Sequence, residues 1–251
     1  MPIAGITFDL WQTLLIDRQE LGGARRDARI DGATRALQQA GETFSRDHIM
    51  EAYRQCSLTC QEIRAQERDL SFMEQLNTFI RHIDPGLSER LPEVVVERIA
   101  AVYADSLFSA PPSTHPQAIS VLRRTKEMGH KVGLISNTGM TPGATFRVYM
   151  QQVGLLEYFD VLTFSDEVQV SKPAQEIFLG TAHELGLPPE QLVHVGDNIL
   201  NDVLGAQHAG MKTIWIDTGQ EASSPKEVRP DAMVTSLGDV PSAVEAIALA
   251  S

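Results

Sequence analysis

Four short segments of this 251-residue chain place acidic, hydroxyl and ammonium side chains where predicted strands end. These segments are Phe8–Leu14, Ile135–Thr138, Val170–Pro173 and His194–Asp202. A carboxylate that acts as a nucleophile needs a cation beside it and a metal that accepts an anionic substrate. Asp9, Asp197 and Asp202 offer the hard oxygen ligands that suit Mg²⁺, and Lys172 offers the cation. Ser136 and nearby backbone N–H groups suit the oxygens of a phosphate.

An alternation of strands and helices must bring these segments together. Strand patterns cover residues 3–8, 131–135, 160–164, 192–195, 212–216 and 232–235, and helical patterns cover 115–128, 145–153, 174–185 and 201–209. This alternation indicates a parallel sheet with helices on both faces, in which ligands bind at the carboxyl ends of the strands. We therefore predict an α/β fold with a doubly wound parallel sheet, and we expect a polar loop at Glu221–Pro225.

Residues 16–108 interrupt the alternation with helical patterns alone. Four helices are expected, at residues 23–40, 46–65, 71–83 and 91–106, and the segment contains no lysine. We predict an α/β core formed by residues 1–15 and 109–251 and a helical domain formed by residues 16–108. The helical domain is therefore an insertion between the first strand and the rest of the sheet.

Composition excludes several other classes of protein. The chain has 21 Lys and Arg residues against 33 Asp and Glu residues, and this acidic surface repels nucleic acid. Its apolar runs are far shorter than the roughly 18–20 residues that cross a bilayer, and its first residues do not have the pattern of a signal peptide. We expect a cytoplasmic protein with no nucleic-acid or membrane partner, in which Cys56 and Cys60 stay reduced.

In this order, the four segments resemble the motifs of the haloacid dehalogenase (HAD) superfamily. The resemblance covers residues 3–15 and 112–217. It implies a Rossmann-like catalytic core, and it implies that the insertion is the helical cap of the subfamily whose cap lies between the first and second motifs. It also implies hydrolysis of a small molecule, most often a phosphorylated one, with Mg²⁺ as cofactor.

The resemblance also implies a role for each motif residue. Asp9 is the nucleophile that forms an aspartyl intermediate, and Lys172 neutralises Asp9 and the substrate. Ser136 binds the transferred group together with its neighbour Asn137. Asp197 ligates Mg²⁺, and Asp202 acts on it directly or through water.

Three further residues have less specific expected roles. Asn198 and Asn201 either steady the acidic loop or cap the following helix. His194 is expected to be a satisfied histidine of the core.

Trp11 departs from the family pattern. Phosphatases of the family carry a second Asp at this position, which protonates the leaving oxygen and then activates water. An indole has no titratable proton near neutral pH and can do neither, although the backbone carbonyl of Trp11 can still contact Mg²⁺. Gln12 replaces a small residue and brings a bulky polar side chain to the entrance. The prediction is therefore an atypical Mg²⁺-dependent phosphatase, in which Trp11 and Gln12 face the substrate.

Two alternative functions remain open. Two-haloacid dehalogenases of the superfamily carry a tyrosine at the Trp11 position and a cap arginine for the substrate carboxylate, and Arg54 resembles that arginine by local sequence. They need no metal, whereas residues 196–202 keep both magnesium acids, which favours phosphate chemistry. The second alternative is a catalytically weak member that binds a phosphorylated ligand or a protein partner. Phosphonate hydrolases use a cap lysine, which is missing here. The sequence predicts no particular oligomeric state.

Overall fold

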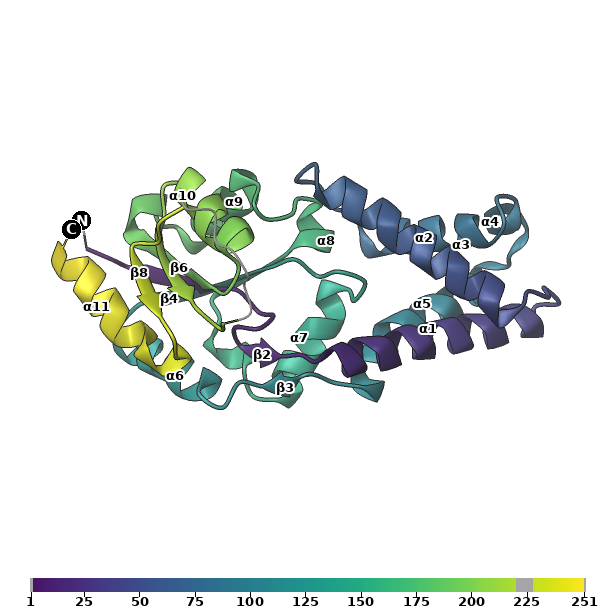
Figure 1. Ribbon diagram of the computed structural model, residues 1–251, viewed down its shortest axis with the longest axis horizontal. Helices are drawn as coiled ribbons and strands as arrows, with labels where there is room; N and C mark the ends of the chain where they lie inside the picture. Colours follow the sequence, from purple (N-terminus) through teal and green to yellow (C-terminus); the bar gives the residue numbers. More distant parts are fainter. Residues whose placement is uncertain (1, 220–227, 251) are drawn as a thin grey trace.

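The computed structural model describes residues 2–219 and 228–250 and consists of a sheet-containing part and a helical part, which lie side by side along the long axis of the molecule (Figure 1). The loop expected at Glu221–Pro225 lies outside the described residues. Within the described ranges, we find no helix with the length and apolar character that a membrane crossing requires.

A six-stranded parallel sheet forms the centre of the first part. Its strands are ordered β5-β4-β1-β6-β7-β8. Their bounds are β1 Gly5–Phe8, β4 Lys131–Ser136, β5 Val161–Phe164, β6 Leu192–Gly196, β7 Lys212–Ile216 and β8 Ala232–Val234. The central strand β1 is buried along its whole length, and Phe8 is in register with Leu134 of β4 and Val195 of β6. The predicted doubly wound parallel sheet is confirmed, with its six predicted strands.

Helices cover both faces of this sheet (Figure 1). One face is covered by α9 (Gln175–Leu185) and α10 (Gly205–His208), and the other by α6 (Ala118–Glu127), α7 (Gly143–Gln152) and α11 (Val240–Ala250). Each face has its own apolar cluster, for example Phe178 against Ile135 on the first face and Phe146 against Phe8 on the second. Short helical turns complete this part: η1 Leu156–Tyr158, α8 Ser165–Val168, η2 Pro189–Gln191, η3 Ile199–Leu204 and η4 Leu237–Asp239. The helix predicted at residues 201–209 begins as a π-helical turn, η3, and continues as α10.

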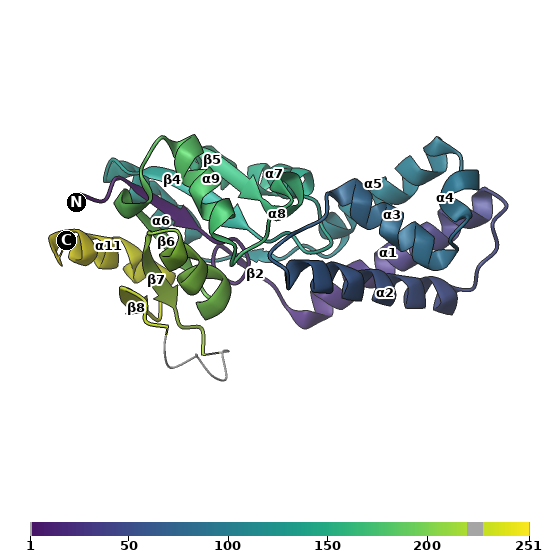
Figure 2. The same cartoon turned by 90° about the horizontal axis from the view of Figure 1, so that it is seen from above.

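The helical part is built from five helices around an apolar cluster of its own (Figure 2). They are α1 Gln19–Gln39, α2 Arg46–Arg64, α3 Phe72–Ile83, α4 Leu87–Arg90 and α5 Glu93–Ser109. The four predicted helices are present, and α3 begins with a capping box between Ser71 and Glu74. A short helix, α4, which was not predicted, lies between α3 and α5.

A two-stranded antiparallel ribbon joins the two parts. Strand β2 (Leu15–Ile16) carries the chain out of the sheet-containing part, and β3 (Ser113–Thr114) carries it back. No strand was predicted here, because two residues are too short for a periodic pattern to show. The ribbon places the outgoing and returning chain segments next to each other, close to the end of β1 (Figure 1).

Candidate active site

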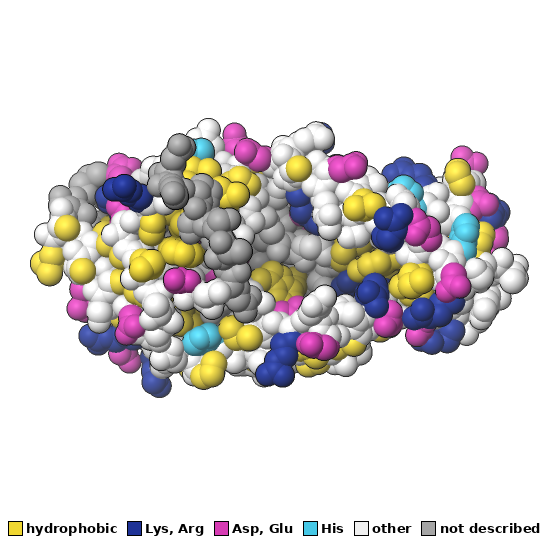
Figure 3. All heavy atoms as spheres, in the orientation of Figure 1, with side chains coloured by type: hydrophobic (Ala, Val, Ile, Leu, Met, Phe, Trp, Pro, Cys, Tyr) yellow, Lys and Arg dark blue, Asp and Glu magenta, His cyan; other side chains and the backbone are white. Residues whose placement is uncertain are grey.

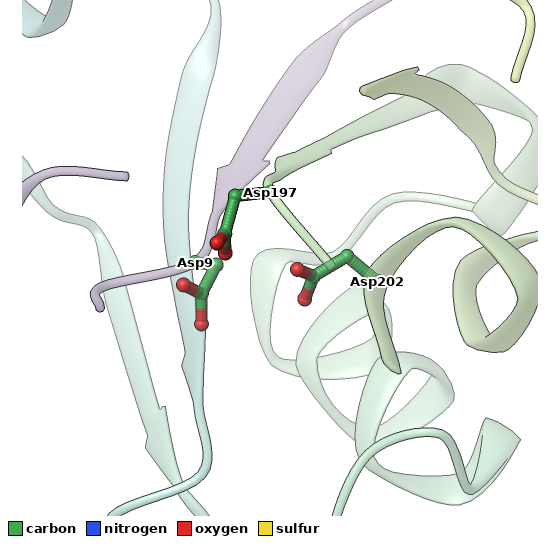
Figure 4. A group of neighbouring side chains, drawn as sticks. All are labelled: Asp9, Asp197 and Asp202. Atoms are coloured by element: carbon green, nitrogen blue, oxygen red, sulfur yellow. The ribbon is translucent and has the colours of Figure 1, made fainter. Parts of the chain in front are cut away.

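Three carboxylates meet where β1 and β6 end (Figure 4). Asp9 follows the last residue of β1, and Asp197 follows the last residue of its neighbour β6. Asp202 comes from η3, one turn further along the chain. Ligand oxygens of the three side chains lie within 4.8 Å of one another. The adjacency of β1 and β6 therefore brings together carboxylates that are almost 190 residues apart in the sequence.

The ammonium group of Lys172 joins two of these carboxylates. Lys172 Nζ donates to Asp9 Oδ1 at 2.5 Å and to Asp202 Oδ1 at 2.6 Å, and all three side chains are buried. Asn137 holds the lysine backbone on both sides: Lys172 N–H donates to Asn137 Oδ1 at 2.9 Å, and Asn137 Nδ2 donates to the Lys172 carbonyl at 3.1 Å. Asn137 thus fixes the segment that carries the cation.

The local structure of the acidic loop fixes Asp202. The backbone N–H of Asn198 donates to Asp202 Oδ2 at 3.0 Å, and the Asn198 side chain caps η3 by accepting from the N–H groups of Leu200 and Asn201. Asn198 therefore both caps the turn and steadies the acid. Residue 196 must be glycine, because a Cβ atom there would lie 2.3 Å from Asp202 Cγ.

His194 lies behind Asp202 on β6, fully buried as expected for a core histidine. Its Nε2 lies 3.2 Å from Asp202 Oδ1 and its Nδ1 lies 2.8 Å from Thr7 Oγ1, and Thr7 is its register partner on β1. Burial lowers the pKa of His194, which favours the neutral imidazole. The ring therefore supports Asp202 from the side of the sheet.

Burial and the charges of neighbouring groups shift the pKa values of these carboxylates. Burial raises the pKa of Asp9 to about 6, against the lowering effect of Lys172. Burial, and then the charges of Asp9 and Asp202, raise the pKa of Asp197 to about 7. Burial acts in the same direction on Asp202, but Lys172 and His194 hold its pKa below the ordinary value. A divalent cation among these oxygens would relieve the repulsion.

A cavity of about 250 Å³ opens onto these groups. It is lined by Asp9, Trp11, Gln12, Asn137, Lys172, Asp197, Asn198, Asn201 and Asp202. Ser136, at the end of β4, is not among the lining residues; its hydroxyl is buried and has no hydrogen-bond partner. Arg54 is also absent from the cavity: its side chain is 59% exposed and forms an ion pair with Glu51. The face of the helical part drawn in Figure 3 carries charged side chains of both signs.

A polar chain that links the site to the helical part was missed from the sequence. Ser165 follows the carboxyl end of β5; its Oγ accepts from Thr138 N–H at 3.0 Å and donates to Asp69 Oδ2 at 2.6 Å. The strand-end rule that selected Ser136 would also have selected Ser165. Asp69, in the connection between α2 and α3, carries no such signal, because a buried acid in a loop resembles an exposed one in sequence.

The fold and this site define a class of α/β hydrolases, in which a carboxylate nucleophile and an acidic cluster stand at the carboxyl edge of a parallel sheet. Sequence comparison agrees with this class. The chain belongs to the haloacid dehalogenase-like hydrolase family, which matches residues 3–210.

Individual relatives include phosphatases and dehalogenases. The chain is 31% identical over 223 residues to a glyceraldehyde 3-phosphate phosphatase of Methanopyrus kandleri, covering 87% of this chain and 85% of that protein. Its fold resembles a HAD phosphatase from Thermococcus onnurineus, with a TM-score of 0.61 and 26% identity over 95% of this chain and 96% of that one. It also resembles a 2-haloacid dehalogenase from Pseudomonas syringae, with a TM-score of 0.67 and 20% identity over 98% and 99% of the two chains. The last likeness shows a shared fold only.

Proposed function

We propose that this hydrolase is a Mg²⁺-dependent phosphatase of small phosphorylated metabolites, which acts through an aspartyl-phosphate on Asp9. The cluster of Asp9, Asp197 and Asp202 around Lys172 carries this proposal. The phosphatase names among the relatives support it.

The donor set fits Mg²⁺. The three carboxylates provide hard oxygen ligands within 4.8 Å of one another, and burial, followed by the charges of Asp9 and Asp202, raises the pKa of Asp197 to about 7. Asp9, Asp197 and the backbone carbonyl of Trp11 would hold the ion, with Asp202 contacting it directly or through water. When bound, the ion offsets the charge of the carboxylates and of a phosphate substrate.

In this proposal, each side chain at the site has its own role in the reaction. Lys172 keeps Asp9 ionised, so that one carboxylate oxygen is available to attack phosphorus and form the aspartyl-phosphate. Asn137 holds the lysine segment in place and, with Gln12 and Trp11, faces the substrate. A buried hydroxyl without a partner costs about 1–3 kcal/mol, and Ser136 carries one at the end of β4, directly before the lining residue Asn137. Its role in this proposal is to donate to a phosphate oxygen.

We assign residues 16–108 the role of a cap over the cavity. Most buried apolar side chains of this segment form a cluster of their own, against which Met140 of the sheet-containing part packs. Polar contacts between the two parts suit a lid that moves, because such interfaces permit relative motion.

The dehalogenase alternative has weaker support. Hydrolysis of a haloacid needs no metal, so a dehalogenase function would not explain why a third carboxylate, Asp197, lies in the cluster. Arg54 was predicted to bind a substrate carboxylate, but its guanidinium group forms an ion pair with Glu51 at the surface. The alternative of a catalytically weak member that binds a ligand differs from both hydrolases because it would bind the ligand without turning it over.

A substrate screen tests the proposal. Phosphorylated metabolites and 2-haloacids are incubated with the enzyme, each with millimolar Mg²⁺ and with EDTA. Phosphate release that requires Mg²⁺ is expected. Metal-independent halide release would establish the dehalogenase instead, and binding without turnover would establish the third alternative.

Metal binding has an independent readout in thermal melting. A ligand that binds only the folded state raises its stability by mass action, so the melting temperature is expected to rise with millimolar Mg²⁺. Asp197→Asn should reduce this rise. Asp105→Asn is the matched control, because Asp105 is an exposed aspartate of α5. An unchanged melting temperature of the unmodified enzyme in Mg²⁺ would argue against the site.

A further inference from the structure

The indole of Trp11 is fixed in place beside Asp9. Its ring meets Phe146 of α7 edge to face, with centroids 5.2 Å apart. The guanidinium carbon of Arg25 lies 5.7 Å from the centre of the indole. Arg25 is itself buried, and its Nη1 donates to the Ala110 carbonyl at 2.7 Å. The indole is therefore held by elements of both parts.

The neighbouring side chain of the cavity, Gln12, is also tied down. Its backbone takes a left-handed conformation with φ of 56°, and its N–H donates to the Leu15 carbonyl at 2.7 Å. Gln12 Nε2 donates to the Asp17 carbonyl at 3.1 Å. A carboxamide has no proton to give near neutral pH, so Gln12 can orient a ligand but cannot act as an acid.

The ionisable side chains that line the cavity are all engaged. They are Asp9, Lys172, Asp197 and Asp202. Asp9 is the proposed nucleophile, and Lys172 donates to two carboxylates at once. Asp197 and Asp202 are the proposed metal ligands. Among the lining residues that the structure describes, none is left to protonate a leaving oxygen.

We infer that the enzyme acts on phosphate compounds whose leaving group departs as a stable anion, with acyl phosphates as the preferred class and aryl phosphates next. The inference rests on the proposed phosphatase function and names its substrate class. A carboxylate or an acidic phenolate leaves without a proton, whereas the alkoxide of a sugar or a simple alcohol needs one. General acid catalysis is typically worth about 10²–10⁴-fold, and alkyl phosphates would lose that factor here.

The two chemical steps balance without an acid from the protein. In the first, an Asp9 oxygen bonds to phosphorus while the bond from phosphorus to the carboxyl oxygen breaks, and the electron pair leaves with the carboxylate. In the second, water adds to phosphorus and the Asp9 carboxylate departs. Both protons of that water stay with the product, which is released as dihydrogen phosphate. The aspartyl-phosphate is itself an acyl phosphate, so its leaving group also needs no proton.

A series of leaving groups tests this inference on the unmodified enzyme with Mg²⁺. The value of kcat/KM is measured for acetyl phosphate, for phenyl phosphates whose phenol pKa rises stepwise, and for ethyl phosphate. We expect kcat/KM to fall steeply as the pKa of the leaving group rises, by at least about 10²-fold from acetyl to ethyl phosphate. A flat dependence would overturn the inference.

Two substitutions at one position separate acid chemistry from packing. Trp11→Asp adds a carboxyl group and should flatten the dependence by raising ethyl phosphate turnover relative to nitrophenyl phosphate. Trp11→Phe shrinks the side chain without adding an acid and should leave the dependence steep. Flattening by Trp11→Phe would assign the effect to the size of the side chain and overturn the inference.

Failure of the inference and failure of the proposed function look different. If ethyl phosphate is cleaved as fast as acetyl phosphate, and Asp9→Asn abolishes both reactions, the phosphatase stands and the substrate class is wrong. If the enzyme releases phosphate from no member of the series, the phosphatase function itself is wrong.

Discussion

The surroundings of Asp9 support the role of nucleophile proposed for it. It is 6% exposed, and burial raises its pKa, while Lys172 at 2.5 Å favours the ionised form. Asp9→Asn keeps the shape of the side chain but provides an amide, which is a far weaker nucleophile. We expect this variant to lose hydrolysis, with at most a hundredth of the original rate, and to keep its circular dichroism and cooperative melting.

The control for this substitution is Asp105→Asn, an identical chemical change at an exposed site on α5. It should hydrolyse substrate at the original rate. An Asp9→Asn enzyme that retained more than a tenth of the activity would show that another group attacks the substrate.

Strand-end positions were predictable at the scale of residues, and long-range side-chain contacts were not. Asp9 and Asp197 stood out because they directly follow apolar runs, and Lys172 stood out through the family motif of residues 170–173. Arg54 was selected from its local sequence, and the structure places it at the surface with Glu51. Arg25 was overlooked because its burial depends on contacts with residues 85 positions away in the chain, such as Ala110.

At the scale of elements, the close crossing of α1 and α5 depends on Gly32. A Cβ atom at this position would lie 2.1 Å from Val102 Cγ1 of α5. Alanine favours a helix by about 1 kcal/mol over glycine, but overpacking typically costs 1–3 kcal/mol and this contact is severe. We expect Gly32→Ala to lower the free energy of unfolding by about 1–3 kcal/mol, measured by urea denaturation.

Two variants check the origin of this effect. Val102→Ala should relieve the clash, so the double variant should be more stable than the sum of the two single changes predicts. Gly23→Ala lies on the same helix, where the nearest atom to an added Cβ is Arg26 Nη2 at 4.0 Å. It should stabilise the protein slightly. Additive effects of Gly32→Ala and Val102→Ala would contradict the proposed clash.

The start of α7 carries a pH-dependent contact. Asp166 accepts from the N–H of Gly143, the first residue of α7, at 3.1–3.2 Å. Burial raises the pKa of Asp166 to about 6, against the effect of this hydrogen bond. Because its pKa is higher in the folded state, the carboxyl group contributes stability below the unfolded pKa of 3.8, and this contribution is lost as the pH rises through about 6.

Asp166→Asn removes this titration and keeps an acceptor for Gly143. From pH 4.5 to 7, its free energy of unfolding should therefore rise relative to the unmodified protein, by about 1 kcal/mol or more. The measurement is urea denaturation at several pH values, with Asp105→Asn as the control. A constant difference across this range would mean that Asp166 titrates normally.

The elements themselves were largely predictable. Every strand of the sheet coincides with an apolar run bounded by turn residues. The helices of the insertion show the helical repeat of apolar residues in their sequences. The ribbon of β2 and β3 was not predicted, because each of its strands has only two residues. The π-helical turn η3 escaped because its shape follows from the hydrogen bonds of Asn198 and Asp202 rather than from any period.

At the scale of the whole molecule, the insertion is attached to the sheet-containing part at three places, and the third is the loop after β4, where Thr141 Oγ1 accepts from Arg29 Nη2 at 2.7 Å. The first is the ribbon, where Arg25 ties the outgoing chain at Asp17 to the returning chain at Ala110. The second, which we name the latch, is formed by residues 64–71 of the insertion and residues 165–171 beyond β5. The cavity is lined by Gln12 near the ribbon and by Asn137 near the loop after β4, so the latch and the contacts of that loop must open if the insertion is to swing about the ribbon.

The latch consists mainly of polar contacts. The backbone N–H of Asp69 donates to the Gln169 carbonyl at 3.0 Å, and the N–H of Ser171 donates to the Glu67 carbonyl at 3.1 Å. At its centre, Ser165 Oγ donates to the buried carboxylate of Asp69 at 2.6 Å. Hydrogen bonds to a charged group are worth about 1.5–3 kcal/mol, so this one contributes much of the closing energy.

Ser165→Ala should therefore favour the open form, because it leaves the Asp69 carboxylate short of a donor and the Thr138 N–H without its acceptor. The N–H groups of Asp69 and Ser171 should exchange with deuterium about tenfold faster or more, since each 1.4 kcal/mol corresponds to a factor of ten. Amides of the central strand β1 should not change, because opening the latch leaves the sheet intact. Asp105→Asn is the control: it changes an exposed side chain of α5 outside the latch and should alter exchange little. Equal acceleration in the latch and in β1 would mean that the substitution weakens the whole fold, and the latch would then not be a separate opening unit.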